Sequence, residues 1–200
     1  MEQQQSLRYR LLDELRGLNL ISMMLYHGMW DVVFLFGITQ KWYIGRPGFL
    51  WQQSICWIFL LLSGFCLPMG RHPFKRGAVV FGAGALVTAG TLLFMPEDVV
   101  WFGVLTLLGS AMLITAALDA LLRRIPPAVG MVVSAALFWV TYPTMSGFWN
   151  LPGGRLVLPQ VLYSNGLTAY LGFMPKDFFS TDYFPLLPWL FLFWCGFYLH

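Results

Sequence analysis

The chain has 200 residues, of which 58% are hydrophobic and 10% are charged, with a formal net charge of +3 and a mean hydropathy of +0.67. Soluble domains carry about 25% charged residues, so this composition excludes an ordinary soluble fold and predicts that lipid surrounds most of the chain. The 18 Phe, 9 Trp and 8 Tyr agree, because aromatic rings collect at membrane interfaces.

The N-terminal sequence MEQQQSLRYRLLDELRG has an amphipathic start and no small-residue cleavage pattern, so we expect a retained first membrane helix rather than a signal peptide.

Apolar runs of about 20 residues bounded by charge, Pro or Gly predict about six transmembrane helices in a single all-α polytopic bundle. No basic residue ends the sixth run, which leaves a C-terminally incomplete chain open. The six runs are 18–38, 49–69, 77–95, 99–122, 127–145 and 186–200.

The distribution of basic residues predicts that the N-terminus is cytoplasmic. With that orientation eight basic residues face inwards and four outwards, and the turn at Glu97 and Asp98 is acidic and external. The inner eight are Arg8, Arg10, Arg16, Arg71, Lys75, Arg76, Arg123 and Arg124, and the outer four are Lys41, Arg46, Arg155 and Lys176.

A long outer connection, residues 146–185, precedes the last span. It is too apolar and aromatic for a disordered linker, and long connections in compact proteins are commonly functional. We expect it to be structured, with short interfacial helices folded back on the outer end of the bundle. The third span carries Gly77, Gly82, Gly84 and Gly90, which predict a small-residue face for close helix contact.

The three cysteines, Cys56, Cys66 and Cys195, form no CxxC pair and no even set, so we expect neither a disulfide framework nor a metal site. We interpret them as packing residues. No nucleic-acid partner is expected.

An ionisable stripe follows one face of the first span. Arg16 and His27 are eleven residues apart, which at about 100° per residue returns to nearly the same face. Asp13 lies about one turn before Arg16, and Asp31 one turn after His27. Ionisable groups at membrane depth are costly and normally face a protein interior or a water-filled cavity.

Two interpretations of the stripe stay open. A structural one makes His27 a packing histidine and Arg16 an ordinary basic helix end. A functional one lets Asp31 fix the imidazole tautomer, which leaves the other ring nitrogen of His27 as base or nucleophile.

The spacing of Arg16, Gly17 and His27 resembles the Arg-x10-His signature of membrane acyltransferases. That group includes the acyltransferase-3 proteins and the heparan-alpha-glucosaminide N-acetyltransferase catalytic domain family. The run FSTDYFPLLPW at 179–189 resembles an element of the latter family, whose bacterial members include small multi-pass proteins. The runs FLLLSG at 59–64 and WFGVL at 101–105 are similar to it too, so the resemblance covers essentially the whole chain.

The resemblance implies transfer of an acetyl group from cytosolic acetyl-CoA to an extracytoplasmic glycan or amino sugar. His27 would be the acyl carrier or the general base, and Asp31 would orient its ring. A homodimer in the cytoplasmic membrane would be compatible with related enzymes. Basic residues of the inner face would meet the CoA phosphates: Arg16, Arg71, Lys75, Arg76, Arg123 and Arg124.

Asp182, Tyr183 and Trp189 stand at the outer start of the last span, where a carboxylate, a phenol and an indole suit a sugar. Asp182 could instead cap a helix start, and both roles are compatible. Two other functions stay open: a small-solute transporter whose path the first-span stripe lines, and a non-catalytic membrane subunit. The acceptor and the acyl chain length are not readable from the sequence.

Overall fold

The computed structural model describes the backbone of residues 2–200 and the side chains of residues 10–200. Arg8, one of the residues used for the predicted orientation, lies outside the described side chains. The chain forms two compact units, Met1–Leu62 and Ser63–His200.

The first unit is built from α1 (Glu2–Trp30), a π-helical turn (Asp31–Leu35), α2 (Lys41–Ile44) and most of α3 (Arg46–Cys66). Three polar contacts join α1 to the segment after it. The Asn19 side-chain amide donates to the carbonyl of Ile55 at 3.2 Å, and the indole N–H of Trp51 donates to the Ser22 hydroxyl at 2.8 Å. The Tyr43 hydroxyl donates to the backbone carbonyl of Tyr26 at 3.0 Å.

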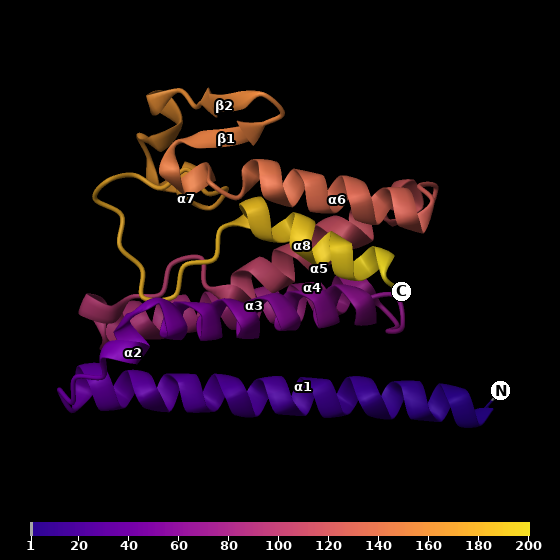
Figure 1. Ribbon diagram of the computed structural model, residues 1–200, viewed down its shortest axis with the longest axis horizontal. Coiled ribbons are helices and arrows are strands. Elements are labelled where there is room, and N and C mark those ends of the chain that lie inside the picture. Colours follow the sequence, from indigo (N-terminus) through magenta and orange to yellow (C-terminus); the bar gives the residue numbers. More distant parts are fainter. Residues whose placement is uncertain (1) are drawn as a thin grey trace. The chain divides into compact units, whose positions relative to one another are not determined.

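The second unit contains four helices, α4 (Pro73–Phe94), α5 (Val104–Leu122), α6 (Pro127–Thr141) and α8 (Leu186–Tyr198). The pairs α4–α5 and α6–α8 pack along their lengths, and α8 also contacts α5. Figure 1 shows this order, with α8 between α5 and α6. Pro at the first turns of α4 and α6 suits helix starts, since those N–H groups have no partner within the helix.

Glycines set the close helix contacts of this unit. A Cβ at Gly109 of α5 would overlap the backbone of Phe81 on α4, and a Cβ at Gly64 would overlap the carbonyl of Phe193 on α8. Gly77 and Gly84 likewise face α5, as the predicted small-residue face requires. Gly82 and Gly90 have no atom within 4 Å of a built Cβ, so these two do not belong to that contact.

The fold is the predicted all-α polytopic bundle, with eight α-helices among the described residues. Five segments are long and apolar enough to cross a membrane: Arg10–Leu35, Arg46–Cys66, Pro73–Phe94, Val104–Leu122 and Pro127–Ser146. The sixth predicted span is the shorter apolar helix α8 of 13 residues. The membrane side on which the N-terminus lies stays a prediction.

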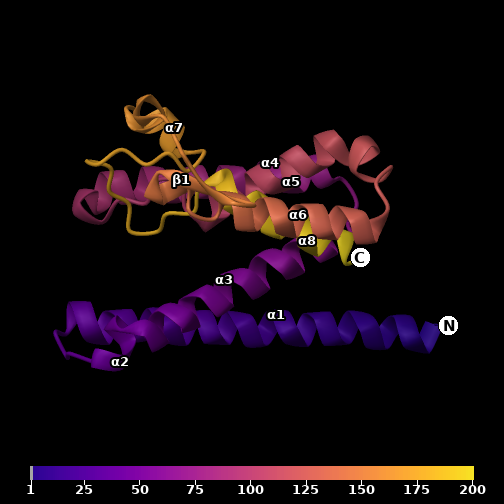
Figure 2. The same ribbon diagram turned by 45° about the horizontal axis from the view of Figure 1, so that its top comes forward.

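The connection before α8 is structured, as predicted, but it is not wholly helical. It contains two 3-10 turns (Thr144–Ser146 and Gln160–Tyr163) and the single-turn helix α7 (Gly166–Ala169). Between them lies an antiparallel hairpin of β1 (Phe148–Leu151) and β2 (Gly154–Val157) that the sequence analysis did not predict. Figure 2 shows the part that carries α7 at the end of the second unit opposite the C-terminus.

Candidate functional site

The first-span stripe lies on a flank of α1 that the first unit does not use for packing. Asn19, Ser22 and Tyr26 define the packed face. At about 100° per residue, His27 points about a quarter turn away from that face. The His27 side chain is accordingly exposed, and its ring lies edge-to-face with the Tyr26 ring, with centroids 6.2 Å apart.

Asp31 begins the π-helical turn that follows α1, and its carbonyl accepts the Phe36 amide at 2.9 Å. Its carboxylate is exposed, and no hydrogen bond joins it to His27 among the described residues. Single π turns inside helices occur frequently at functional sites, because the widened turn reorients the side chains around it. The predicted orienting role of Asp31 stays a prediction.

Arg16 forms an ion pair with Asp13, with a guanidinium nitrogen 3.0 Å from a carboxylate oxygen. Both side chains are well exposed, so the pair contributes little to stability. The N-terminal end of the stripe is therefore an exposed ion pair at the surface of the first unit.

The other predicted donor-binding cations gather at one end of the second unit. Because α4 and α5 are antiparallel, the start of α4 and the end of α5 meet there, together with the turns that precede α4 and follow α5. We call this set the basic end: Arg71, Lys75, Arg76, Arg123 and Arg124, all exposed.

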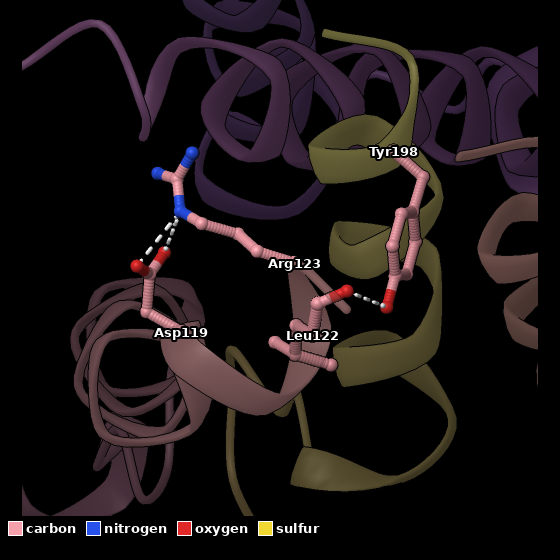
Figure 3. A network of polar contacts seen from close by, with 4 residues as sticks. All are labelled: Asp119, Leu122, Arg123 and Tyr198. Atoms are coloured by element: carbon pink, nitrogen blue, oxygen red, sulfur yellow. Dashed lines mark hydrogen bonds and ion pairs between the residues drawn. The ribbon is translucent and has the colours of Figure 1, made fainter. Parts of the chain in front are cut away.

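Local contacts fix two of these cations. The Arg76 guanidinium lies over Gly70, where a Cβ would collide with it. Arg123 binds both carboxylate oxygens of Asp119, at 2.7 and 2.8 Å, beside the hydrogen bond from the Tyr198 hydroxyl to the Leu122 carbonyl (Figure 3). The end of α8 is thus fastened to the turn that carries the basic pair Arg123 and Arg124.

Two segments far apart in the chain run together at the other end of the second unit. Residues 180–184 donate backbone hydrogen bonds to residues 99–104 and accept others through their side chains, and we call the two stretches the paired segments. Thr181 donates to the Val99 carbonyl at 3.1 Å, and Phe184 donates to the Phe102 carbonyl at 2.9 Å. The Ser180 hydroxyl accepts the Trp101 amide at 2.9 Å.

Asp182 caps a helix, although not the one it precedes. Its carboxylate accepts the amide of Val104, the first residue of α5, at 3.1 Å. Gly103 stands at the N-cap position of α5 and supplies no side-chain oxygen. A residue 78 positions away therefore satisfies one of the amide groups that a helix start leaves without a partner.

Tyr183 and Trp189 are tied into the packing. The Tyr183 hydroxyl donates to the Ala169 carbonyl at 2.6 Å, and burial raises the pKa of this phenol above its ordinary value. Trp189 is 5% exposed, and its ring packs against Phe138 and Phe184 with centroids 5.9 and 5.5 Å away. A sugar would reach this indole only after a rearrangement of α6 or of the paired segments.

A partly open cavity of about 100 Å³ lies beside the Asp182 carboxylate. No local sequence pattern indicates it, because it forms where α4, α5 and the paired segments meet. Its wall is mainly apolar, with Thr106 as the second polar side chain. The lining residues are Gly84, Val87, Val100, Gly103, Val104, Leu105, Thr106 and Asp182.

These features define a multi-pass membrane protein with an exposed imidazole on its first span, a cationic end and a helix-capping acidic motif. A family model described as heparan-alpha-glucosaminide N-acetyltransferase, catalytic, matches residues 8–200. The chain belongs to this family, which confirms the resemblance and makes it a transferase of the membrane N-acetyltransferase kind. Comparison with curated proteins and with solved structures gave no match.

Proposed function

We propose that the protein is a multi-pass enzyme of the cytoplasmic membrane that moves an acetyl group from cytosolic acetyl-CoA to an extracytoplasmic glycan or amino sugar. Family membership over residues 8–200 supports the acetyl transfer, and the five long apolar helices support a reaction at the membrane. His27, Asp31 and the cations of both units are the residues we assign to it.

The exposure of His27 is the observation that carries the catalytic assignment. The side chains of Asn19 and Ser22 form hydrogen bonds with the segment that follows α1 in the first unit. The His27 imidazole, by contrast, has no hydrogen-bond partner among the described residues. Ionisable groups in membrane spans are costly and normally mark functional positions that face a protein interior or a water-filled cavity. An imidazole with both nitrogens available can take part in acyl transfer.

Two reaction routes use the same ring. In the covalent route, an imidazole nitrogen of His27 attacks the thioester carbonyl, the carbon–sulfur bond breaks and CoA leaves as the thiolate. The acceptor amine then attacks the acyl group, the acyl–imidazole bond breaks, and the proton that the amine loses ends on the CoA thiol. In the direct route, His27 takes the proton from the acceptor while that group attacks the thioester carbonyl. The carbon–sulfur bond then breaks, and the imidazolium returns the proton to the departing CoA thiolate.

The donor requires cations for its phosphates and a path for its long arm. The basic end offers exposed guanidinium groups, which bind phosphate oxygens bidentately. Arg124 suits this role best, since Arg123 already holds Asp119 on one side of its guanidinium. Arg16 adds a further cation from the first unit. Asp182 and Tyr183 are our candidates for the acceptor, with Trp189 behind them.

The test uses the full chain in proteoliposomes with labelled acetyl-CoA and glucosamine as the acceptor. We expect acetylated glucosamine from the wild type and a loss of at least about a hundredfold for His27→Ala. Leu25→Ala is the matched control, because Leu25 lies two residues earlier on α1 and is also exposed. It should retain wild-type activity.

An active His27→Ala protein would overturn the catalytic assignment. Wild-type protein without any acetyl-CoA-dependent transfer would overturn the proposed function itself. Mass spectrometry of protein incubated with acetyl-CoA alone separates the two routes, because only the covalent one leaves an acetyl group on the His27 peptide.

A further inference from the structure

The hairpin of β1 and β2 is fastened to the end of α6. The indole N–H of Trp149 donates to the hydroxyl of the buried Thr144 at 2.9 Å, and the Tyr163 hydroxyl donates to the Thr144 carbonyl. The Asn150 side-chain amide donates to the backbone carbonyl of Trp139 at 3.2 Å. The first strand therefore lies along the last turn of α6, and Figure 1 shows the hairpin on the side of α6 away from α8.

This attachment sets the depth of the hairpin relative to the membrane. The span that contains α6 ends at Ser146, and Trp139 precedes that end by seven residues. At 1.5 Å per residue the hairpin reaches back by about 10 Å. The headgroup layer of a bilayer is about 5–8 Å thick on each side. The hairpin thus overlaps in depth with the headgroups and the outermost part of the acyl chains.

The backbone of the hairpin requires a partly polar environment. The sheet has two strands, so each strand has one edge without a strand partner. All four residues of β2 are exposed. Backbone groups at such an edge need water or polar headgroups, because hydrocarbon offers them no hydrogen bond. This requirement places the hairpin at the level of the headgroups, in agreement with its attachment to α6.

The side chains of the hairpin are nevertheless apolar on the outside. Val157 is 78% exposed, and Leu151 and Leu156 are exposed too. They continue the exposed apolar surface of α6, to which Trp139 and Met145 belong. A helix of a membrane span turns such a surface to lipid. The hairpin therefore extends the lipid-facing surface of the span into the interface.

Arg155 adds one cation to this apolar surface. Its guanidinium lies over the Phe148 ring, 4.6 Å from the centroid. Phe148 pairs with Val157 and Arg155 with Asn150, so the side chain reaches back from the turn towards the start of β1 and the end of the span. Long basic side chains direct their charge to the membrane surface in this way. Arg155 has no ion pair within the described residues, and stacking leaves the N–H groups at its rim for a phosphate.

We propose that the hairpin is a phospholipid-binding anchor in the leaflet at the C-terminal end of α6. Leu151, Leu156 and Val157 contact the upper parts of the acyl chains, and Arg155 binds the phosphate of an anionic phospholipid. The partner is the same membrane that α6 spans. This inference goes beyond the proposed function and does not depend on acetyl transfer.

The test uses the full chain in nanodiscs of equal parts phosphatidylcholine and phosphatidylglycerol, with p-benzoylphenylalanine in place of Val157. After irradiation, mass spectrometry should find lipid joined to the peptide that contains position 157. The same probe in place of Leu92, exposed on α4, is the positive control. In place of Glu97, exposed in the acidic turn after α4, it should capture no lipid.

Two results at position 157 would overturn the anchor. Absence of a lipid adduct, with position 92 reactive, would mean that the hairpin stands in water. A crosslink to a second copy of the chain would make the hairpin a protein interface instead.

A second measurement tests Arg155 on the same preparation. Phosphatidylglycerol should exceed phosphatidylcholine among the adducts by about fivefold, which corresponds to about 1 kcal/mol for one cation at an anionic surface. Arg155→Gln should reduce the ratio to nearly one. Lys176→Gln is the matched control, because Lys176 is an exposed cation of the same connection outside the hairpin, and it should keep the preference. An unchanged ratio in Arg155→Gln would overturn the phosphate contact.

Discussion

Two regions carry the candidate site residues, and they differ in how the chain holds them. His27 on α1 and Asp31 on the π-helical turn that follows it are both exposed, with no hydrogen bond between them among the described residues. In the paired segments, Asp182 and Tyr183 are bound to Val104 and Ala169, which lie 78 and 14 positions away. The candidate side chains of the first unit thus take no part in the described hydrogen bonds that hold its fold, whereas those of the second unit do.

The difference has a physical basis. A group that takes up or passes on a proton or an acyl group needs lone pairs that are not committed to the fold. A group that positions a substrate works better when its own rotamer is locked by neighbours. Substitutions in the two regions should therefore separate activity from stability.

The largest effect should come from the α4–α5 contact on which the paired segments rest. Gly109→Leu places a side chain on the backbone of Phe81 and should cost about 3 kcal/mol or more by overpacking. Gly82→Leu is the matched control, because nothing lies within 4 Å of a Cβ there. Thermal unfolding of the detergent-solubilised protein measures both. Equal stability of the two variants would contradict the contact.

The second-largest loss of stability should come from removal of the cap that Asp182 provides to α5. Asp182→Ala leaves the Val104 amide without its acceptor and should lower the free energy of unfolding by about 2 kcal/mol. Asp182→Asn keeps an acceptor oxygen and should recover part of the loss. The exposed Asp177 provides the control, since Asp177→Ala should leave unfolding unchanged. An Asp182→Ala protein as stable as the wild type would show that the Asp182 carboxylate does not stabilise the start of α5.

The long-range origin of this cap explains which parts of the structure the sequence could predict. Span positions follow from hydropathy, and the predicted starts at 127 and 186 coincide with α6 and α8. The predicted span 99–122 begins too early, because Gly103 ends the preceding loop and α5 starts at Val104. Residues 99–103 are apolar, but backbone bonds to 180–184 hold them outside the helix.

The candidate site shows the same division. The shared flank of Arg16 and His27 follows from helical periodicity alone. The role of Asp182 at α5, the burial of Trp189 and the cavity at Thr106 depend on contacts between distant segments. No local pattern encodes such contacts. The hairpin of β1 and β2 has a partial local signal, since Pro152 and Gly153 form its turn.

In the first unit, Asp31→Asn should lower the rate of acetyl transfer and leave the free energy of unfolding unchanged. The amide cannot stabilise an imidazolium as a carboxylate does, so we expect kcat to fall about tenfold, which corresponds to about 1.4 kcal/mol. Acetyl transfer to glucosamine and thermal unfolding, measured on the same preparation, check both halves. A drop in stability with unchanged kcat would place Asp31 with the structural residues instead.

The smallest effect concerns Tyr183 and depends on pH. Burial raises the pKa of its phenol, so the folded state keeps the proton that the unfolded chain loses above about pH 10. The stability from this group is complete below that pH and declines as the pH rises further, because the unfolded state then binds fewer protons. Tyr183→Phe should lose about 1 kcal/mol near neutral pH, where the hydrogen bond to Ala169 is intact. Its unfolding temperature should also fall less steeply than that of the wild type above pH 10. If the unfolding temperatures of the two proteins fell equally steeply above pH 10, the phenol would not be held as a buried donor. Tyr183 would then resemble His27 and Asp31, whose side chains form no hydrogen bond that holds the fold among the described residues.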